Sequence, residues 1–577
     1  MATTIAQSAA LYTEQVAKTS PREIIDRYLA ELAAAKSRFR GTSLAERISL
    51  AKACRDGCVS TADTWIAEAC RAKGIPLGTP LESEETSAGP MATVRYLRLL
   101  IGSLEDIQRH GHPQLPGRID TAPNGQLRVQ VLPTRGLFDS VLFQGFRADV
   151  WMQPGVTREN LNDHLARAYQ SGAPTVEAVA LVLGAGNVSS IAPTDAFSKL
   201  FQEGKVVLLK MNPVNEYLGP IFERAFAPLI ERGYLRIIYG GADVGSYALA
   251  HDLVDEVHIT GSVFSHETIV WGPPGPERER RKAAGLAALE KQITSELGNV
   301  TPWIVVPGAY SERELDFQAE NVAAMISNNA SFNCIATKMI VTSRQWPQRQ
   351  PFLDKIEAVL ARLPRRKAYY PGAAERFRRF TGHEPAAGPA GTLPWTLVRD
   401  VDEKKSPHFF DEESFVCVCA ETALDATKPE EFLDRVPDFV NDRLWGNLGA
   451  GVMIHPSIRR AAGGEERFGR CLARLRFGTI GVNHWPAIGY ALMCTPWGGF
   501  PEGTLADPRS GLGWVHNTYM LDGAQKTVLE GPLTMWPKPF WFPTHKTAHI
   551  LARKTLALYH RPAWWKIPGL LLPALRG

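Results

Sequence analysis

The first hydrophobic pattern along the chain has the spacing of amphipathic helices. Between residues 21 and 73, and again from 92 to 108, apolar side chains recur three and four positions apart. Each stretch therefore presents one apolar face. Proline and glycine at 76–80 separate the two stretches. We expect helices that pack on other elements and carry no chemistry of their own.

After Gly125 the pattern changes to short runs of β-forming residues separated by turn residues. These runs cover 127–132, 140–143 and 148–152, and they predict three short strands. A helix is expected to follow at 159–169.

From Ala178 onward, nearly continuous apolar runs alternate with helical segments. Strands that are apolar on both faces are typical of parallel sheets buried between helix layers. The alternation therefore predicts a nucleotide-binding α/β domain, with ligands at the turns that follow the strands. The predicted strands are 178–183, 205–210, 235–239 and 256–260.

Length and composition limit the classes of protein. A chain of 577 residues is too long for one ordinary core, so two or three domains are expected. The formal net charge of +4 gives no reason to expect a nucleic-acid partner. The eight cysteines are scattered without a CxxC pair. Neither a metal site nor a disulfide framework is therefore expected, and a reducing compartment fits best.

The N-terminus and the hydropathy pattern bear on location. Residues 1–8 lack the basic start and apolar run of an export signal. The sequence also has no apolar run long enough for a spanning helix. We therefore expect a cytoplasmic protein.

Two turns after predicted strands are candidates for binding a phosphate-containing ligand. Residues 184–187 (Gly-Ala-Gly-Asn) begin like a dinucleotide fingerprint, but Ser189 occupies the position of the third glycine. Thr260-Gly261-Ser262 ends a strand, and Ser262 is placed to cap a helix whose free N–H groups would face a pyrophosphate. Both patterns also occur at turns without a ligand.

Cys334 is the candidate nucleophile. It lies among amide and small side chains, between Asn328 and Lys338. A thiolate is the most nucleophilic side chain near neutral pH, and its reactivity depends on its surroundings. The alternative is a buried structural thiol, because most isolated cysteines behave as small hydrophobic residues. Partners elsewhere in the chain are needed to decide between the two.

Such partners follow in a definite order along the sequence. Glu296-Leu297-Gly298 precedes Cys334 by thirty-eight residues, and Asn329 precedes it by five. Glu413-Ser414-Phe415 and three glycine-rich runs at 448–452, 497–499 and 510–511 come later. Together with the turn at 184–187, the strand ending at Lys210 and Thr260-Gly261-Ser262, this order resembles the aldehyde dehydrogenase superfamily over roughly residues 30–520.

The resemblance implies an α/β fold with a Rossmann-type cofactor domain, an α/β catalytic domain and a small β flap for oligomerisation. A homodimer or homotetramer is implied as well. The implied boundaries are 1–125 for the helical part of the cofactor domain, 126–155 for the flap, 156–295 for the Rossmann-type domain, 296–485 for the catalytic domain, 486–525 for a return segment to the flap, and 526–577 for a C-terminal extension.

The resemblance also implies oxidation of an aldehyde to a carboxylic acid with NAD or NADP. Cys334 would be the nucleophile, Glu296 the general base that hydrolyses the thioester, and Asn187 a donor to the oxyanion. Two alternatives stay open, namely reduction of an acyl thioester such as an acyl-CoA, and a cofactor-binding scaffold without turnover. The implied cofactor-binding residues are Lys210, Glu216, Gly261, Ser262, Glu413 and Phe415.

Several positions depart from the family pattern. His266 stands where the family has the second glycine of a GxxxxG turn, which predicts a reshaped pyrophosphate end of the site. The segment from Lys210 to Glu216 differs from the family's Lys-Pro-Ser-Glu, so the choice between NAD and NADP stays open. Phe332 and Asn333 change the residues next to the nucleophile.

Two segments are locally basic. The run 362–379 is most simply a solvated face, with a phosphate or CoA site as the alternative. Between Lys526 and Gly577, eight Lys or Arg residues stand against one acid, Glu530, and tryptophans are interleaved with them. That composition suits a membrane surface, where rings lie at headgroup depth and cations meet anionic lipid. The alternative is an arm that packs on the same chain or on another subunit.

Overall fold

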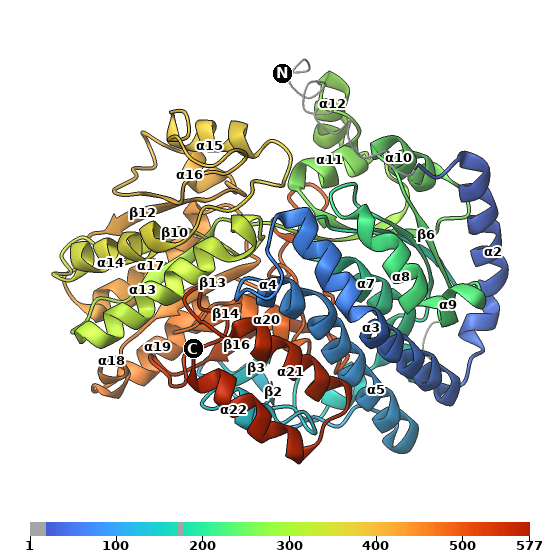
Figure 1. Ribbon diagram of the computed structural model, residues 1–577, viewed down its shortest axis with the longest axis horizontal. Helices are drawn as coiled ribbons and strands as arrows, with labels where there is room; N and C mark the ends of the chain where they lie inside the picture. The colour runs from blue at the N-terminus through green and yellow to red at the C-terminus, as the bar shows by residue number, and fades with distance from the viewer. Residues whose placement is uncertain (1–18, 171, 173–176) are drawn as a thin grey trace.

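Two β-sheets form the framework of the molecule (Figure 1). The computed structural model describes residues 19–170, 172 and 177–577. Within them, a six-stranded sheet has the order β15-β8-β7-β4-β5-β6, and a ten-stranded sheet has the order β1-β2-β3-β16-β14-β13-β9-β10-β12-β11. Helices cover both sheets (Figure 1). The predicted α/β fold class is confirmed.

The six-stranded sheet is parallel except for the short β15, which pairs antiparallel with β8. Its central strands are buried along almost their whole length, as their continuous apolar runs require. Because these strands run in one direction, their carboxyl ends meet along one edge of the sheet. The strands are β4 (Val179–Leu183), β5 (Val206–Lys210), β6 (Leu235–Ile238), β7 (Glu256–Gly261), β8 (Gln292–Leu297) and β15 (Gly511–Leu512).

The ten-stranded sheet joins a parallel part to an antiparallel part. Strand β16 pairs parallel with β14 and antiparallel with β3, and thereby connects the two. The strands are β1 (Ile119–Thr121), β2 (Leu127–Leu132), β3 (Arg147–Met152), β9 (Thr301–Val305), β10 (Thr337–Ser343), β11 (Thr396–Val398), β12 (Val418–Leu424), β13 (Gly449–Met453), β14 (Thr479–Val482) and β16 (Ala524–Glu530).

The helices pack around these sheets. The two predicted N-terminal helical regions are confirmed as α2, α3 and α5. The main helices are α2 (Arg22–Arg40), α3 (Leu44–Lys73), α4 (Glu82–Thr86), α5 (Ala92–His110), α7 (Ile191–Phe197), α8 (Gly219–Ala225), α9 (Ala227–Glu231), α10 (Ala242–Ala250), α11 (Val263–Trp271), α12 (Pro276–Ala284), α13 (Glu312–Ser327), α14 (Arg349–Arg362), α15 (Ala373–Thr381), α16 (His408–Asp411), α17 (Pro429–Arg443), α18 (Pro456–Arg460), α19 (Gly464–Arg474), α20 (Ala487–Leu492), α21 (Ala548–His560) and α22 (Ile567–Leu575).

The strands predicted for the flap belong to the ten-stranded sheet of the same chain. Strands β2 and β3 form where they were expected, and β16 joins them to β14. The expected boundary at residue 526 falls inside β16, so the C-terminal extension proper begins at Gly531. A role of these strands in oligomerisation stays a prediction.

Three further expectations about local structure can be compared with the fold. The strand predicted at 140–143 is wrong, because residues Asp139–Leu142 form the short helix α6. The helix predicted at 159–169 is reduced to two 3₁₀ turns, Leu161–His164 and Arg167–Tyr169. Residues 1–8, on which the expected location depends, lie outside the described residues. Among residues that the structure describes, no helix is long and apolar enough to span a bilayer.

Helix α6 carries one partner of a buried ion pair. The carboxylate of Asp139 accepts two hydrogen bonds from the Arg95 guanidinium, both 2.7 Å long. The Arg95 side chain is 1% exposed and that of Asp139 is fully buried. Arg95 also donates to the carbonyl of Leu492 at 2.7 Å and lies over the Tyr559 ring of α21. The pair therefore ties α5, α6, α20 and the C-terminal extension together.

Replacing Asp139 by alanine is expected to lower the free energy of unfolding by about 3–5 kcal/mol, because Arg95 would be left as an uncompensated buried charge. The matched change Asp522→Ala breaks a pair with Arg167 that is exposed on both sides, and should cost less than about 1 kcal/mol. Urea unfolding followed by tryptophan fluorescence measures both. Equal losses would contradict the assigned role of the pair.

Candidate active site

A cleft of about 720 Å³ opens at the carboxyl ends of the six-stranded sheet. Eight of the nine predicted site residues line it, whereas Glu216 does not. Asn187, Lys210, Gly261, Ser262 and Glu296 come from the carboxyl ends of strands in the six-stranded sheet, which meet at a common edge. Cys334, Glu413 and Phe415 come from segments that precede β10 and β12 of the ten-stranded sheet. The eight are Asn187, Lys210, Gly261, Ser262, Glu296, Cys334, Glu413 and Phe415.

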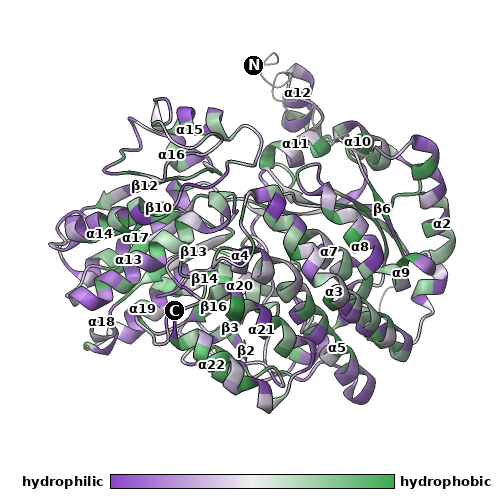
Figure 2. Ribbon diagram, in the orientation of Figure 1, coloured by the Kyte–Doolittle hydropathy of each residue, from purple (hydrophilic) through white to green (hydrophobic). Residues whose placement is uncertain are grey.

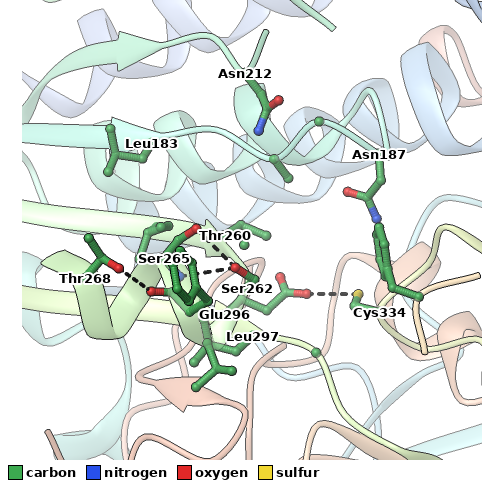
Figure 3. Close-up of a pocket in the computed structure, with 18 of the residues that line it drawn as sticks. Leu183, Asn187, Asn212, Thr260, Ser262, Ser265, Thr268, Glu296, Leu297 and Cys334 are labelled. Carbon is green, nitrogen blue, oxygen red and sulfur yellow. Dashed lines mark hydrogen bonds between the residues drawn. The ribbon is translucent and has the colours of Figure 1, made fainter. Parts of the chain in front are cut away.

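The thiol of Cys334 faces the carboxylate of Glu296 across this cleft (Figure 3). Cys334 Sγ donates to Glu296 Oε1 at 3.3 Å. Cys334 follows a turn that precedes β10, and Glu296 lies near the end of β8. Cys334 is half-buried, while the other seven cysteines are buried. It is therefore the most accessible thiol of the chain.

Burial dominates the electrostatics of this pair. Desolvation, with the charge of Asp195 as a second cause, raises the pKa of Glu296 to about 7. Desolvation and the charges of Glu296 and Glu413 raise the pKa of the Cys334 thiol well above its usual range. Near neutral pH the thiol therefore keeps its proton, and Glu296 is poised to exchange one.

Asn187 places an amide next to the nucleophile turn. Its Nδ2 donates to the carbonyl of Phe332 at 3.2 Å, which uses one of the two amide hydrogens. Figure 3 shows Asn187 extending from the turn after β4 toward the side of the cleft that holds Cys334. The second hydrogen is a candidate donor to an oxygen that develops negative charge near the thiol.

The turn before Cys334 has an uncommon backbone conformation. Three consecutive residues, Asn329, Ala330 and Ser331, have positive φ angles of 52°, 54° and 68°. Residues with a Cβ atom rarely adopt this region, and each costs of order 1–3 kcal/mol unless the surroundings hold it. Strained backbone of this kind needs a set of fixed partners.

Lys73 provides those partners at the end of helix α3. Its buried ammonium donates to Asn329 Oδ1 and to the carbonyl of Asn187, both at 2.9 Å. It also forms an ion pair of 2.8 Å with Glu85, in which both side chains are at most 5% exposed. Tyr369 donates to the same Asn329 oxygen at 2.9 Å. One cation therefore connects the turn that carries Asn187 with the turn that carries Cys334.

The remaining polar atoms of Asn329 are also satisfied. Its Nδ2 donates to the carbonyls of Asn187 and Phe332, at 3.0 and 2.8 Å. Its backbone N–H donates to Glu84 of α4 at 3.1 Å, and Glu84 pairs with Arg366. Full satisfaction of a buried polar network makes it rigid, so the strained turn is held from both sides.

A second buried cation lies on the far side of the nucleophile. Lys338 donates to Ser331 Oγ at 2.9 Å and to the carbonyls of Ser331 and Val416, both at 3.1 Å. Burial lowers the pKa of Lys338 to about 8. Burial raises the pKa of Glu413 to about 7 against the opposing charges of Lys338 and Arg376. Lys338 thus holds Ser331 of the strained turn from the side opposite Lys73.

The carboxylate of Glu413 lies so close to Gly298 that no other residue fits at position 298. A Cβ atom on Gly298, just after β8, would lie 1.9 Å from Glu413 Oε2. Glu413 Oε1 is buried without a hydrogen-bond partner in the described structure. Phe415, with a φ of 42°, packs against Tyr370 with ring centroids 5.0 Å apart. Glu413 and Phe415 thus form one wall of the cleft.

The opposite end of the cleft begins at helix α11. Ser262 is its N-cap, as expected from the sequence, and its hydroxyl accepts from the N–H of Ser265 at 3.2 Å. Lys210 and Asn212 line the cleft there, and burial lowers the pKa of Lys210 to about 8. His266 is fully buried and does not line the cleft. A histidine in place of the family's glycine therefore affects how α11 packs, and it does not change the cleft surface directly.

Several residues of the site have no recognisable sequence signal. Lys73, Glu85 and Tyr369 lie far from Cys334 in the chain and look like ordinary helix and loop residues. Arg376 belongs to the basic run 362–379, yet it lines the cleft, and its Nε and Nη2 atoms are buried without a partner among the described residues. For Arg376 the expectation of a solvated face is wrong.

Comparisons with known proteins identify related folds. No protein-family model and no curated protein matches the sequence. The structure is similar to an aldehyde dehydrogenase from Brucella melitensis biovar abortus 2308, with 17% identity, a TM-score of 0.58 and coverage of 89% of each chain. It is also similar to aldehyde dehydrogenase C from Pseudomonas syringae, solved with NAD+ and octanal, with 15% identity, a TM-score of 0.60 and coverage of 89% and 90%. A third similar structure is lactaldehyde dehydrogenase from Escherichia coli, with 14% identity and a TM-score of 0.58. The match covers 88% of this chain and 91% of that one.

Replacing Lys73 by methionine is expected to destabilise the nucleophile turn, because Glu85 loses its partner and two acceptors lose a donor. The free energy of unfolding should fall by about 3–5 kcal/mol. Lys52→Met is the matched control on the same helix, since Lys52 pairs with Glu105 at the surface and should cost less than about 1 kcal/mol.

A second measurement separates a local effect from a global one. In conditions where Lys73→Met stays folded, Cys334 should react with iodoacetamide at a rate different from wild type, whereas Lys52→Met should react at the wild-type rate. Mass spectrometry of the alkylated peptide reports both rates. An unchanged rate in Lys73→Met would show that Lys73 does not position the turn.

Proposed function

Because the chain has the aldehyde dehydrogenase fold, we propose that it oxidises an aldehyde to a carboxylic acid with NAD or NADP, and that Cys334 is the nucleophile. The observation that supports this most directly is the 3.3 Å contact between Cys334 Sγ and Glu296 Oε1 inside the cleft. Asn187 and the cleft wall of Glu413 and Phe415 provide the other groups that the chemistry requires.

The residues of the cleft fit a nicotinamide dinucleotide. The N-terminus of α11 leaves N–H groups for a pyrophosphate behind the Ser262 cap. Lys210 lines the cleft and would reach a ribose hydroxyl or a phosphate. The orphaned Glu413 Oε1 would accept from the nicotinamide ribose. When bound, the cofactor supplies a hydride acceptor. Glu216 lies outside the cleft lining, so Asn212 is the better placed of the two to influence the choice between NAD and NADP.

The first step of the proposed mechanism is proton transfer within the Cys334–Glu296 pair. Glu296 Oε1 accepts the thiol proton along the existing S–H···O contact, and the thiolate attacks the carbonyl carbon of the aldehyde. The C–S bond forms, and the carbonyl π electrons move to oxygen. The raised pKa of Glu296, about 7, allows it to exchange a proton near neutral pH, whereas the raised pKa of the thiol makes the thiolate a transient species that forms as it attacks.

The developing oxyanion needs donors at the place where its charge appears. The free hydrogen of Asn187 Nδ2 and the backbone N–H of Cys334 are the candidates. Both are held by the network around Lys73, which bonds to the carbonyl of Asn187 and to Asn329. The donors therefore need no rearrangement when the charge forms.

After hydride loss, a thioester on Cys334 remains to be hydrolysed. Glu296, once it has released the thiol proton to solvent, takes a proton from a water molecule that attacks the thioester carbon. The C–S bond breaks, the Cys334 thiolate takes the remaining proton of the acid, and the product leaves as its carboxylate. A glutamate at this position favours water over CoA as the acceptor of the acyl group.

The pH dependence follows from the ionisation of Glu296. A base must be deprotonated to act, so hydrolysis should rise as the pH passes through about 7, the raised pKa of Glu296. In Glu296→Gln this rise should disappear, and steady-state turnover should fall by about 10²–10⁴-fold. The first burst of cofactor reduction should also be slower than in wild type, because the thiol loses the acceptor of its proton. Glu105→Gln, a surface change on α5, is the control. Stopped-flow absorbance at 340 nm distinguishes burst from steady state, and an unchanged profile in Glu296→Gln would exclude it as the base.

Asn187→Ala is expected to lower the turnover number by about 10²–10³-fold, because one oxyanion donor is removed. Its unfolding midpoint should stay close to that of wild type, since the backbone carbonyl that Lys73 binds is retained. Asn124→Ala, in an exposed turn, should change neither quantity. A loss of stability as large as the loss of turnover would assign Asn187 a structural role instead.

Cys334→Ser tests the nucleophile itself. With a panel of short, long and aromatic aldehydes and both cofactors, the variant should show no burst and no steady-state turnover, because a serine hydroxyl is a far weaker nucleophile. Turnover equal to wild type would contradict the assignment, and the absence of turnover in wild type would favour a scaffold. Rapid aldehyde formation from an acyl-CoA and NADPH would favour the reductase alternative.

A homo-oligomeric state and a cytoplasmic location stay predictions.

A further inference from the structure

The C-terminal helix exposes a continuous apolar surface. Trp564 and Trp565 are 69% and 77% exposed, and Leu571, Leu572 and Leu575 are 51%, 55% and 47% exposed. We call these five residues the tryptophan–leucine face. Figure 2 shows α22 in the hydrophobic colours along one side of the molecule. Large apolar side chains gathered on one exposed helix mark an interaction site more often than an inert surface.

Helix geometry places Leu571, Leu572 and Leu575 on one side of α22, because Leu575 lies about one turn after the other two. Trp564 and Trp565 belong to the 3₁₀ turn Trp564–Lys566 that leads directly into α22. The opposite side of α22 is inward, because Leu570 and Pro573 are buried. The Trp564 ring also packs on Phe138 with centroids 4.5 Å apart, so the helix has a fixed orientation.

Part of the extension is an arm packed on its own chain. Arg553 of α21 pairs with Glu82 of α4 and with Asp63 of α3, the latter at 2.6 Å. Lys538 of the extension lies 3.4 Å from Glu320. Just before the extension, the ammonium of Lys526 in β16 donates to the last carbonyls of α19. These cations are used within the protein. Helix α21 therefore packs on its own chain as an arm, which was the alternative expected from the sequence. The outer side of α22 stays exposed.

The charges around the tryptophan–leucine face have one sign. Residues 531–577 contain seven Lys or Arg and no Asp or Glu. Lys546, Lys554, Arg561 and Arg576 are exposed, and no ion pair is recorded for them in the part of the chain that the structure describes. Lys566 lies over the Trp565 ring at 5.4 Å. An apolar stripe with tryptophans and a border of free cations matches an interface whose surface is anionic and whose interior is apolar.

The same charges argue against a second copy of the chain as the occupant. In a two-fold symmetric contact, each patch meets itself. The cations that border the face would then approach one another with no acidic residue of this segment to neutralise them, and like charges in an interface are unfavourable. An anionic lipid surface has no such conflict.

We propose that the tryptophan–leucine face docks onto an anionic membrane surface, with α22 lying in the plane of the interface. The two tryptophans enter at headgroup depth, the three leucines reach the acyl boundary, and Arg561 and Arg576 contact lipid phosphates. Because Arg553 and the Arg95–Asp139 pair fasten α21 to the body, docking of α22 brings the whole molecule to the membrane. The proposal is independent of the proposed oxidation.

Flotation of the full-length protein with lipid vesicles tests the docking. Vesicles of phosphatidylcholine with about 30% phosphatidylglycerol should bind the protein, and added salt should weaken the binding because its charge component is screened. Two double variants probe the two components: Trp565→Gln/Leu572→Gln removes apolar side chains, and Arg561→Glu/Arg576→Glu reverses charge. Each should weaken vesicle binding by about tenfold or more.

Matched controls exclude nonspecific effects. Leu77→Gln/Leu286→Gln removes two other exposed leucines, and Lys404→Glu/Lys405→Glu reverses two other exposed cations. Both should bind vesicles like wild type. Circular dichroism verifies that all variants are folded, and turnover of a short water-soluble aldehyde should be the same in all of them.

Three outcomes would overturn the proposal. The first is no binding of wild type to anionic vesicles. The second is equal binding of wild type and Trp565→Gln/Leu572→Gln. The third is a wild-type dimer, seen by light scattering without lipid, that the same variant abolishes, because the face would then be an interface between copies.

Discussion

The buried ammonium of Lys73 is the contact on which the geometry of the site depends. A single cation at the end of α3 bonds to the carbonyl of Asn187 and to the side chain of Asn329, and Glu85 balances its charge. The strained turn of Asn329, Ala330 and Ser331 would otherwise relax toward commoner backbone angles. Taking this lysine out of water costs several kcal/mol, and the hydrogen bonds and the ion pair offset that cost.

Two carboxylates around one thiol give the site its chemistry. Glu296 and Glu413 are both buried, and burial raises both pKa values to about 7. Their charges in turn disfavour the Cys334 thiolate. A thiol that ionises only when a neighbour takes its proton is protected from adventitious reaction and still ready for a substrate. Lys338, which bonds to Ser331 of the turn, offsets part of the negative charge of Glu413.

The ten-stranded sheet also determines where the C-terminal extension begins. Because β16 pairs with β14 and β3 of the same chain, the antiparallel strands and the parallel strands form one sheet. The residues that follow β16 then run across the N-terminal helices, where α21 packs, and end in α22. The tryptophan–leucine face is therefore presented by a helix that is itself anchored through Arg553 and, behind it, Arg95.

The sequence by itself determined the elements whose burial is local. Continuous apolar runs predicted β4 to β7, helical spacing predicted α2, α3 and α5, and Ser262 was recognisable as a cap because its partner is three residues away. Motif order alone pointed to Cys334, Glu296, Asn187 and Glu413. Only the tertiary structure decided which distant groups neutralise buried charges. Lys73 meets Asn329 across 256 residues, and Arg95 meets Asp139 across 44 residues. Lys526 is buried within β16, in a segment for which the sequence left open a membrane contact or an arm packed on the protein. A pattern along the chain encodes which face is apolar, whereas the partner of a buried charge depends on folding in three dimensions.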